Sequence, residues 1–387
     1  MSRHIGRNSR AGLLLAALLA VLGVLGVACS GPDRSESRGC PDDGPTCRTS
    51  PAAPSPSATP SATAGEATAG LSASPSPTPT PTPKPTATRT PAPPAKPTPT
   101  AGAGSTHGAP AARTNCASPG ACGFPDADST GPRISLKPKK AGNWAIRTDG
   151  LVIRGQDITG SLDIYANDVT VIDTKVTSDN WWGINLRPGF SGLKVLHSTI
   201  TAVPGKGPDN GGVDYAVSNM GASSIEVGWC DVSVFGDALS MGQGNIHDNY
   251  VHDIEPFINL GGEWQHTNSV ISGGGNTGHL IIRHNTLLNP TGLKEGASGS
   301  VGLFADTGVV RNVTVDDNWM AGGAYALYGG STGATGIRVT GNIFSTEYHP
   351  TSGGYGVVAH WNEGGAGNVW RDNRMSDGRL VKPEPSS

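Results

Sequence analysis

The sequence predicts an all-β protein in which a right-handed parallel β-helix of about nine coils follows a signal peptide and a disordered stalk. One short pattern of apolar and polar residues recurs nine times between residues 152 and 375. The connections between the copies vary in length, whereas the pattern itself keeps its length. The five C-terminal copies carry an asparagine at the same place. Such a repeat favours stacked coils that are joined by variable loops.

The first 28 residues are expected to be a signal peptide. Three arginines precede an apolar run at residues 13–28, which is too short to span a membrane comfortably. The run ends in "LGVAC", which resembles the lipobox of bacterial lipoproteins and implies that Cys29 carries a lipid after cleavage. A plain signal peptide and an uncleaved anchor are the alternatives. All three place the rest of the chain outside the cytoplasm, either anchored to the cell membrane or secreted.

Residues 29–114 are expected to form a disordered linker. From about Thr49 to Arg113 the chain consists mainly of Pro, Ser, Thr and Ala, with almost no large apolar residue. Burial of apolar surface therefore cannot offset the entropy cost of ordering this segment. Behind a lipid anchor, such an extended segment acts as a stalk that holds the following domain, residues 115–387, away from the membrane.

Charge and cysteine content argue against several classes of function. The formal charge of -3 and the lack of a basic stripe do not indicate a nucleic-acid partner. Cys116 and Cys122 lie six residues apart, a spacing that permits a disulfide in an oxidising compartment without requiring one. No cysteine pair has the spacing of a zinc site with histidines nearby. We expect neither a metal nor another cofactor, and we expect a monomer.

Each copy of the repeat predicts two strands joined by a corner. In order, the copies read VIRGQDI, VIDTKV, VLHSTI, VGWCDV, IHDNYV, IRHNTL, VDDNWM, VTGNIF and WRDNRM. Two apolar residues two positions apart require extended backbone, and a third apolar residue after a break requires a sharp turn. Asparagine suits this turn because it tolerates the left-handed conformation and because stacked amides can bond from coil to coil. The corner position holds Gln156, Thr174, Ser198, Cys230, Asn249, Asn285, Asn318, Asn342 and Asn373.

A third strand is predicted to precede most copies. These strands read GINLR, YAVSN, DALSM, NSVIS, VGLFAD, YALYG and YGVVAH. Their expected interior residues are Ile184, Val217, Leu239, Val270, Leu303, Leu327 and Val357. Because side chains alternate along a strand, the residues that follow these are expected to face outward. A β-sandwich is the alternative architecture, but it would require antiparallel strands with turns at regular intervals.

The opening of the repeat region resembles a known group of proteins. "GFPDADSTGP", followed by "DGLVIRGQDITGSLDIYANDVTVIDTKVT", is similar to the first coils of actinobacterial secreted β-helix proteins. From about Gly123 to Met375 the chain resembles the pectate-lyase-like superfamily. The resemblance implies binding or cleavage of polysaccharide along the outer face of the strands that precede each copy. Members often carry a His-Thr-Asp-Gly run there, whereas "HTNSVIS" has Asn268 and Ser269 at the last two places.

The third strands carry the first candidate site. Alternation is expected to place Asp306, Tyr328 and His360 outward on neighbouring coils, with Phe304 beside them. An acid, an aromatic ring and a histidine could serve a lyase, in which a base removes a proton, or a hydrolase with acid and base catalysis. The alternative is that they are ordinary surface residues.

The longest insertion, "EPFINLGGEWQHTNS", carries the second candidate site. Long loops without regular structure are often binding loops. It is expected to bring Glu255, Glu263, Trp264 and His266 toward Asp237, where the tryptophan could stack on a sugar. The equally weighted alternative is that the tryptophan packs onto the coil.

Two cations complete the list of candidates. Lys294 and Arg187 could act as lyase bases or bind the carboxylates of an acidic sugar. The functional expectation is a surface or secreted protein that binds or acts on a polysaccharide or cell-wall glycan, as a lyase or a glycosidase. The alternative is a non-catalytic protein that binds surface glycans or serves a structural role.

Overall fold

The computed structural model describes residues 113–219 and 223–383. The expected signal peptide, Cys29 and nearly all of the expected linker lie outside these residues. The described part is all-β, as predicted, with strands β1–β26 and one short 3-10 helix, η2 (Gly120–Cys122). In this part of the chain, no helix is long and apolar enough to cross a membrane.

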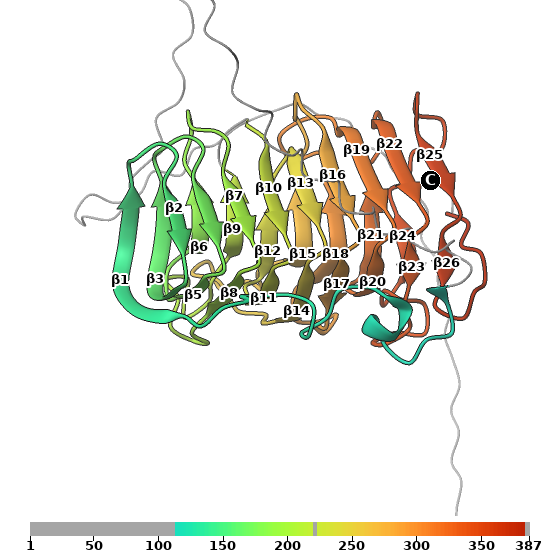
Figure 1. Cartoon of the computed structure of the whole chain (residues 1–387). Helices are drawn as coiled ribbons and strands as arrows, with labels where there is room; N and C mark the ends of the chain where they lie inside the picture. Colours follow the sequence, from blue (N-terminus) through green and yellow to red (C-terminus); the bar gives the residue numbers. More distant parts are fainter. Residues whose placement is uncertain (1–112, 220–222, 384–387) are drawn as a thin grey trace, which may run out of the picture. The chain divides into compact units, whose positions relative to one another are not determined.

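The strands form three parallel ladders, and each coil from β4 to β24 contributes one strand to each ladder (Figure 1). The first ladder leads into the corner of the repeat. It contains β2 (Val152–Arg154), β4 (Thr170–Ile172), β7 (Lys194–Leu196), β10 (Ile225–Gly228), β13 (Gly244–His247), β16 (Leu280–Arg283), β19 (Arg311–Asp316), β22 (Thr335–Thr340) and β25 (Val369–Arg371).

The second ladder follows the corner. It contains the first half of β3 (Gln156–Ile164), then β5 (Lys175–Ser178), β8 (Thr199–Ala202), β11 (Asp231–Val234), β14 (Tyr250–Ile254), β17 (Thr286–Asn289), β20 (Trp319–Gly322), β23 (Ile343–Phe344) and β26 (Arg374–Met375).

The third ladder consists of the strands that precede each copy of the repeat. After β1 (Lys137–Ile146) and the second half of β3 it contains β6 (Trp182–Leu186), β9 (Tyr215–Asn219), β12 (Asp237–Ser240), β15 (Thr267–Ser272), β18 (Ala297–Leu303), β21 (Tyr325–Gly329) and β24 (Gly356–Ala359). Three parallel ladders built from successive coils are the architecture of a parallel β-helix, which confirms that prediction.

The corner differs from the prediction in one respect. The left-handed conformation belongs to the residue before the corner position, not to the asparagine. In all nine coils this preceding residue has φ between 44° and 68°, namely Gly155, Asp173, His197, Trp229, Asp248, His284, Asp317, Gly341 and Asp372. The positive φ of this residue turns the chain sharply, so that the side chain of the next residue points toward the neighbouring coils. Short polar side chains and glycine tolerate such a φ best.

The predicted asparagine ladder is present in the five C-terminal coils. Each of the first four amides donates to the amide oxygen of the next one, at 2.9–3.0 Å, along Asn249, Asn285, Asn318, Asn342 and Asn373. All five side chains are fully buried. Stacking of coils therefore satisfies every one of these amides inside the core, where an unbonded amide would be costly.

The register of the third ladder corrects two of the expected interior positions. Leu327 lies between Val301 and Val358, rather than between Leu303 and Val357. β18 also has an irregularity at its start, where one extra residue enters the strand opposite β15. Leu303 is still buried, two residues after Val301, where it pairs with Gly329.

Residues 113–136, called the strap here, run across all the coils before β1 begins (Figure 1). Asn115 donates its backbone N–H to Ser376 in the last coil, and Arg133 pairs with Asp173 near the first coil. A disulfide joins Cys116 to Cys122, whose Cα atoms are 5.5 Å apart. The strap therefore ties the two ends of the stack together along the outside of the second ladder.

Candidate functional site

The outer row is the line of third-ladder residues that face away from the core. Their neighbours on both sides, such as Leu239, Val270 and Leu327, are fully buried, so alternation turns the row outward. Paired from coil to coil, the row reads Asp163, Asn185, Ser218, Ser240, Ile271, Gly302, Tyr328 and Ala359. Almost every coil presents a different side chain, in contrast to the repeated corner.

Five rings form an aromatic platform at the C-terminal end of the outer row. Tyr328 lies at its centre, with ring centroids 5.0 Å from Phe304, 5.8 Å from His360 and 5.6 Å from Tyr325. Tyr355 extends the platform beyond Tyr325, at 6.0 Å, and is 66% exposed. Phe304 reaches Tyr328 because its ring lies over Gly302, where a Cβ atom would meet the ring at 2.3 Å. The structure therefore brings together Phe304, Tyr328 and His360, three of the residues named from the sequence.

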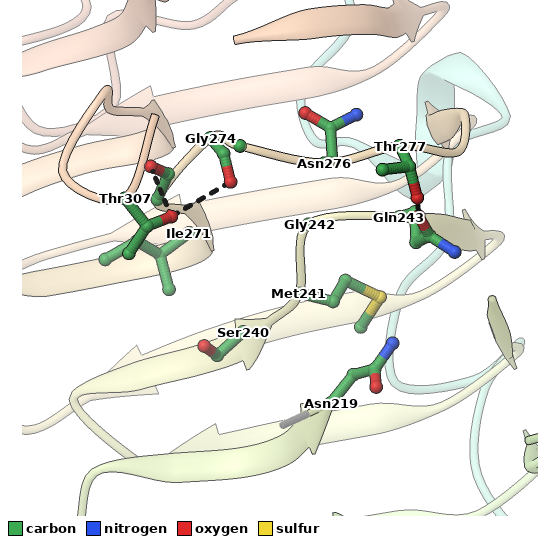
Figure 2. Close-up of a pocket in the computed structure, with 12 residues that line it drawn as sticks. Asn219, Ser240, Met241, Gly242, Gln243, Ile271, Gly274, Asn276, Thr277 and Thr307 are labelled. Atoms are coloured by element: carbon green, nitrogen blue, oxygen red, sulfur yellow. Dashed lines mark hydrogen bonds between the residues drawn. The ribbon is translucent and has the colours of Figure 1, made fainter. Parts of the chain in front are cut away.

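A pocket of about 410 Å³ adjoins the platform (Figure 2). Its floor includes Ser240 and Ile271 of the outer row, and its wall includes the loop that carries Gly274 and Thr277. Ile271 pairs with Gly302, which lies beneath Phe304. Pocket and platform are thus consecutive parts of one face of the third ladder.

Three aspartates at the start of the third ladder form an acid cluster. Asp209, Asp214 and Asp237 are each less than 7% exposed, and none of them forms an ion pair within the described residues. Burial raises the pKa of Asp237 to about 7, and the nearby Asp214 carboxyl adds to this rise. Burial likewise raises the pKa of Asp214 to about 6, with a contribution from Asp209. Carboxyl groups that hold a proton near neutral pH are typical of acid catalysts.

Asn268, in the "HTNS" run, contacts Asp237 of the preceding coil. Its amide nitrogen donates to the Asp237 carboxylate at 2.8 Å, and its amide oxygen accepts from the N–H of Gly299 at 3.0 Å. An aspartate at position 268 would place a second carboxylate against Asp237 on the next coil. The uncharged amide of Asn268 avoids this repulsion, and its hydrogen bond to the carboxylate opposes the rise in the pKa of Asp237.

The insertion at residues 255–266 covers the acid cluster with a different residue from those expected. Phe257 packs against Gly212 and Gly236, where a Cβ atom would lie 2.1 and 3.2 Å from its ring. The backbone N–H of Leu260 donates to Asp209 at 2.7 Å, which pins the insertion to the preceding loop.

The side chains expected to approach Asp237 lie at the surface of this insertion. Glu255, Glu263 and His266 are exposed, and Trp264 is 40% exposed, with its Cβ atom near Gly296. None of the four forms a hydrogen bond or ion pair with Asp237 within the described residues.

The remaining three candidates are Asp306, Lys294 and Arg187, and none of them presents an unpaired charge on the strands of the third ladder within the described residues. Asp306 lies exposed in the loop after β18, and no hydrogen bond or ion pair joins it to Tyr328 or His360 in the described part of the chain. The shifted register of β18 moves it off the strand. Lys294 is exposed in the loop before β18. Arg187 pairs with Asp163 at 3.4 Å and lies over the ring of Trp182.

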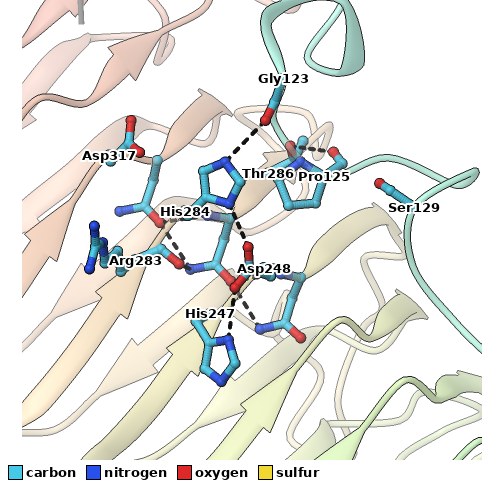
Figure 3. A network of polar contacts seen from close by, with 12 residues as sticks. Gly123, Pro125, Ser129, His247, Asp248, Arg283, His284, Thr286 and Asp317 are labelled. Carbon is cyan, nitrogen blue, oxygen red and sulfur yellow. Dashed lines mark hydrogen bonds and ion pairs between the residues drawn. The ribbon is translucent and has the colours of Figure 1, made fainter. Parts of the chain in front are cut away.

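A second group of ionisable side chains lies at the corner, where it holds the strap (Figure 3). Asp248 bonds to both His247 and His284, at 2.9 and 2.6 Å. His284 also bonds to the backbone oxygen of Gly123, and Arg113 pairs with Asp317. Apart from the bond between the adjacent residues His247 and Asp248, each of these contacts joins neighbouring coils or fastens the strap, so this network is structural. Among residues 113–219 and 223–383, no cluster of histidine, cysteine and acidic side chains could hold a metal ion.

Several residues of the site escaped the sequence analysis. Asp214, Tyr215, Tyr325 and Tyr355 all lie at or just before the start of a third strand, and attention to that position would have found them. Burial and the carboxylates of Asp237 and Asp214 raise the pKa of Tyr215 to about 12, so this phenol belongs to the acid cluster. No family model, curated protein or solved structure matches this chain.

Proposed function

We propose that this protein binds a polysaccharide along the outer row of the third ladder, with sugar rings stacked on the aromatic platform. The observation that supports this most strongly is the continuous set of five rings beside a pocket on one face. Tyrosine and phenylalanine present flat apolar faces, and the tyrosine hydroxyl adds a hydrogen-bonding group. Coils that are about 4.8 Å apart also repeat at roughly the length of a sugar unit.

The same proposal includes where the protein works. A signal peptide with lipidation at Cys29 and a long stalk would hold the domain outside the cell membrane, within reach of a cell-wall or external glycan. Secretion without an anchor serves the same binding function. The resemblance to right-handed β-helix proteins of the pectate-lyase-like superfamily supports a polysaccharide ligand.

The test is glycan retention by the full-length chain, measured by affinity electrophoresis in gels that contain single polysaccharides. We expect Tyr328→Ala to weaken binding about tenfold, because it removes the central ring of the platform. Tyr250→Ala is the matched control, since Tyr250 lies on the second ladder and stacks on His252 instead. Equal binding by wild type and Tyr328→Ala would place the site elsewhere.

Cleavage of the bound glycan is a second candidate function. It is favoured by the pKa of Asp237, about 7, because a protonated carboxyl group can donate to a leaving sugar oxygen. Phe257 would have to move aside, since Asp237 is only 4% exposed. We expect Asp237→Asn to lower the release of reducing ends or unsaturated sugars by about 10²-fold or more while binding persists. A wild-type protein that releases no product would favour the non-catalytic binding protein.

A further inference from the structure

We propose that the pocket beside the aromatic platform is a subsite for an uncharged sugar unit and that it excludes uronates. This inference rests on the proposed function, which it narrows to a class of glycan. The pocket holds about 410 Å³, enough for a ligand of the size of one sugar unit.

The side chains around the pocket are polar but uncharged. Hydroxyl and amide groups come from Asn219, Ser240, Gln243, Asn276, Thr277 and Thr307, and none of the described residues in the lining has an acidic, basic or histidine side chain. Hydroxyls and amides both donate and accept hydrogen bonds, which matches the hydroxyl groups of a neutral sugar. Met241 and Ile271 supply apolar surface for the C–H face of the ring.

Two hydroxyls retain capacity to bond a ligand. Ser240 is half-buried, and its hydroxyl forms no hydrogen bond within the described residues. The hydroxyl of Thr307 donates to the backbone oxygen of Gly273 or Gly274, each at 3.0 Å, so its lone pairs can still accept. Figure 2 shows Thr307 and Ser240 at one end of the pocket, whereas Gln243 and Thr277 lie at the other.

Gln243, in contrast, is used to shape the pocket. Its side-chain oxygen accepts from the backbone N–H of Gly278 at 2.7 Å and from Thr277 at 3.4 Å. This holds the wall at residues 273–278 above β12. The polar cavity is therefore built by internal bonds rather than left by loose packing.

Among the described residues, no basic side chain lines the pocket where it could pair with an acidic sugar. Arg311 lies next to the wall, but the bond that Asn276 donates to it there goes to its backbone oxygen. Arg187 is paired with Asp163, three coils from Ile271 along the outer row. The nearest side chain along the chain from Thr307 is Asp306, which is itself an acid. A carboxylate that entered the pocket would lose hydration without gaining an ion pair. A neutral unit avoids this cost.

The position of the pocket makes it a natural continuation of the platform. The loop after β18 begins with Phe304, which contributes to the platform, and continues to Thr307, which lines the pocket. A glycan that stacks on Phe304 and Tyr328 would therefore place its next unit toward Ile271 and Ser240.

The test compares three hexasaccharides by calorimetry on the full-length chain: cellohexaose, mannohexaose and hexagalacturonate. We expect at least one neutral oligosaccharide to bind about tenfold or more tightly than hexagalacturonate. Ser240→Leu fills the pocket and should weaken neutral binding about tenfold, with an unchanged melting temperature as the control for folding. Thr277→Lys adds a cation to the wall and should improve hexagalacturonate binding about tenfold. Thr148→Lys, at another exposed threonine outside the pocket, should leave it unchanged.

The outcomes separate this inference from the proposed function. If Tyr328→Ala loses binding but Ser240→Leu does not, glycan binding stands and the pocket subsite is wrong. Hexagalacturonate that binds as tightly as the neutral oligosaccharides, or a Thr277→Lys variant that gains nothing, overturns the exclusion of uronates. A chain that retains no polysaccharide or oligosaccharide overturns both proposals.

Discussion

The corner and the outer row each take one residue from every coil, yet they differ in how much variation they tolerate. At the corner, all nine coils place a residue of positive φ before the corner position, and five coils repeat a buried asparagine there. The outer row instead changes from Asn185 through Ser240 and Ile271 to Tyr328. Stacking requires the same backbone conformation in every coil at the corner. It sets no such requirement on the side chains of the outer row, so these can differ from coil to coil to suit a ligand.

The two regions also treat carboxyl groups in opposite ways. At the corner, the paired guanidinium of Arg133 lowers the pKa of Asp173 to about 2, although burial opposes this. Burial also opposes the effect at Asp248, but bonds from His247 and His284 hold the pKa of that carboxyl well below its usual range. At the start of the third ladder, Asp214 and Asp237 have raised pKa values and no cationic partner in the described part of the chain. The corner therefore favours ionised carboxylates that are paired with cations, whereas the acid cluster favours protonated carboxyl groups.

The largest effect should follow from breaking the asparagine ladder. Asn285→Ala removes the bonds that Asn285 makes to Asn318 and to the backbone oxygens of Ile246 and Arg283. It also removes the acceptor of the Asn249 backbone N–H and one of the two acceptors of the Asn249 side-chain amide. Several buried groups lose their partners at once, so we expect the free energy of unfolding to fall by about 3–5 kcal/mol, measured by chemical denaturation.

The same position in the first coil provides the matched control. Gln156 bonds only to the backbone oxygen of Arg154, at 3.3 Å, and is partly exposed. Gln156→Ala should cost less than about 0.5 kcal/mol. Similar losses in the two variants would mean that the ladder adds nothing beyond its local bonds, and the contrast between corner and outer row would weaken.

The pH dependence of stability should separate the two regions next. Asp214 and Asp237 have folded pKa values above the value of about 3.9 expected in the unfolded chain, so the folded state binds more protons. Their contribution is fully present below about pH 4 and is lost as the pH rises toward about 7. The loss should be on the order of a few kcal/mol. Asp173 acts in the opposite sense, because its contribution is lost as the pH falls from about 4 to about 2.

The check is a series of denaturation curves between pH 3 and pH 8 for wild type and Asp237→Asn. The variant keeps the shape of the side chain but cannot titrate, so its stability should decline less between about pH 4 and pH 7. Histidines 247 and 252 have raised pKa values and contribute the same sign in both proteins, so they cancel in the comparison. Parallel curves would show that Asp237 carries a charge in the folded protein.

The corner was predictable from the sequence and most of the site was not, for physical reasons. The asparagines at 249, 285, 318, 342 and 373 reveal a requirement that every coil shares. The register of β18 could not be read in the same way, because Val301 and Leu303 are both apolar and two residues apart. Either could face Leu327.

Contacts between distant segments were also out of reach. Arg113 meets Asp317 across 204 residues, and no local pattern links them. Tyr355 reaches Tyr325 because β24 pairs with β21, where Gly356 lies opposite Tyr325. Tyr328 and His360 were found because they lie near strand positions that alternation governs.

The smallest expected effect tests whether the corner ladder can be extended. Cys230 occupies the position before Asn249, is fully buried, and bonds only weakly through sulfur to the backbone oxygens of Val195 and Gly228, both at 3.4 Å. Cys230→Asn should supply an amide that donates to Asn249 and accepts from the N–H of Ser198, adding one rung. We expect a gain of about 1 kcal/mol in the free energy of unfolding, measured by chemical denaturation. Cys230→Ala, which adds no bond, is the matched control and should lose stability. If Cys230→Asn is no more stable than Cys230→Ala, the ladder depends on asparagine partners on both sides. The coils before Asn249 would then be held by backbone pairing and apolar packing without an amide ladder.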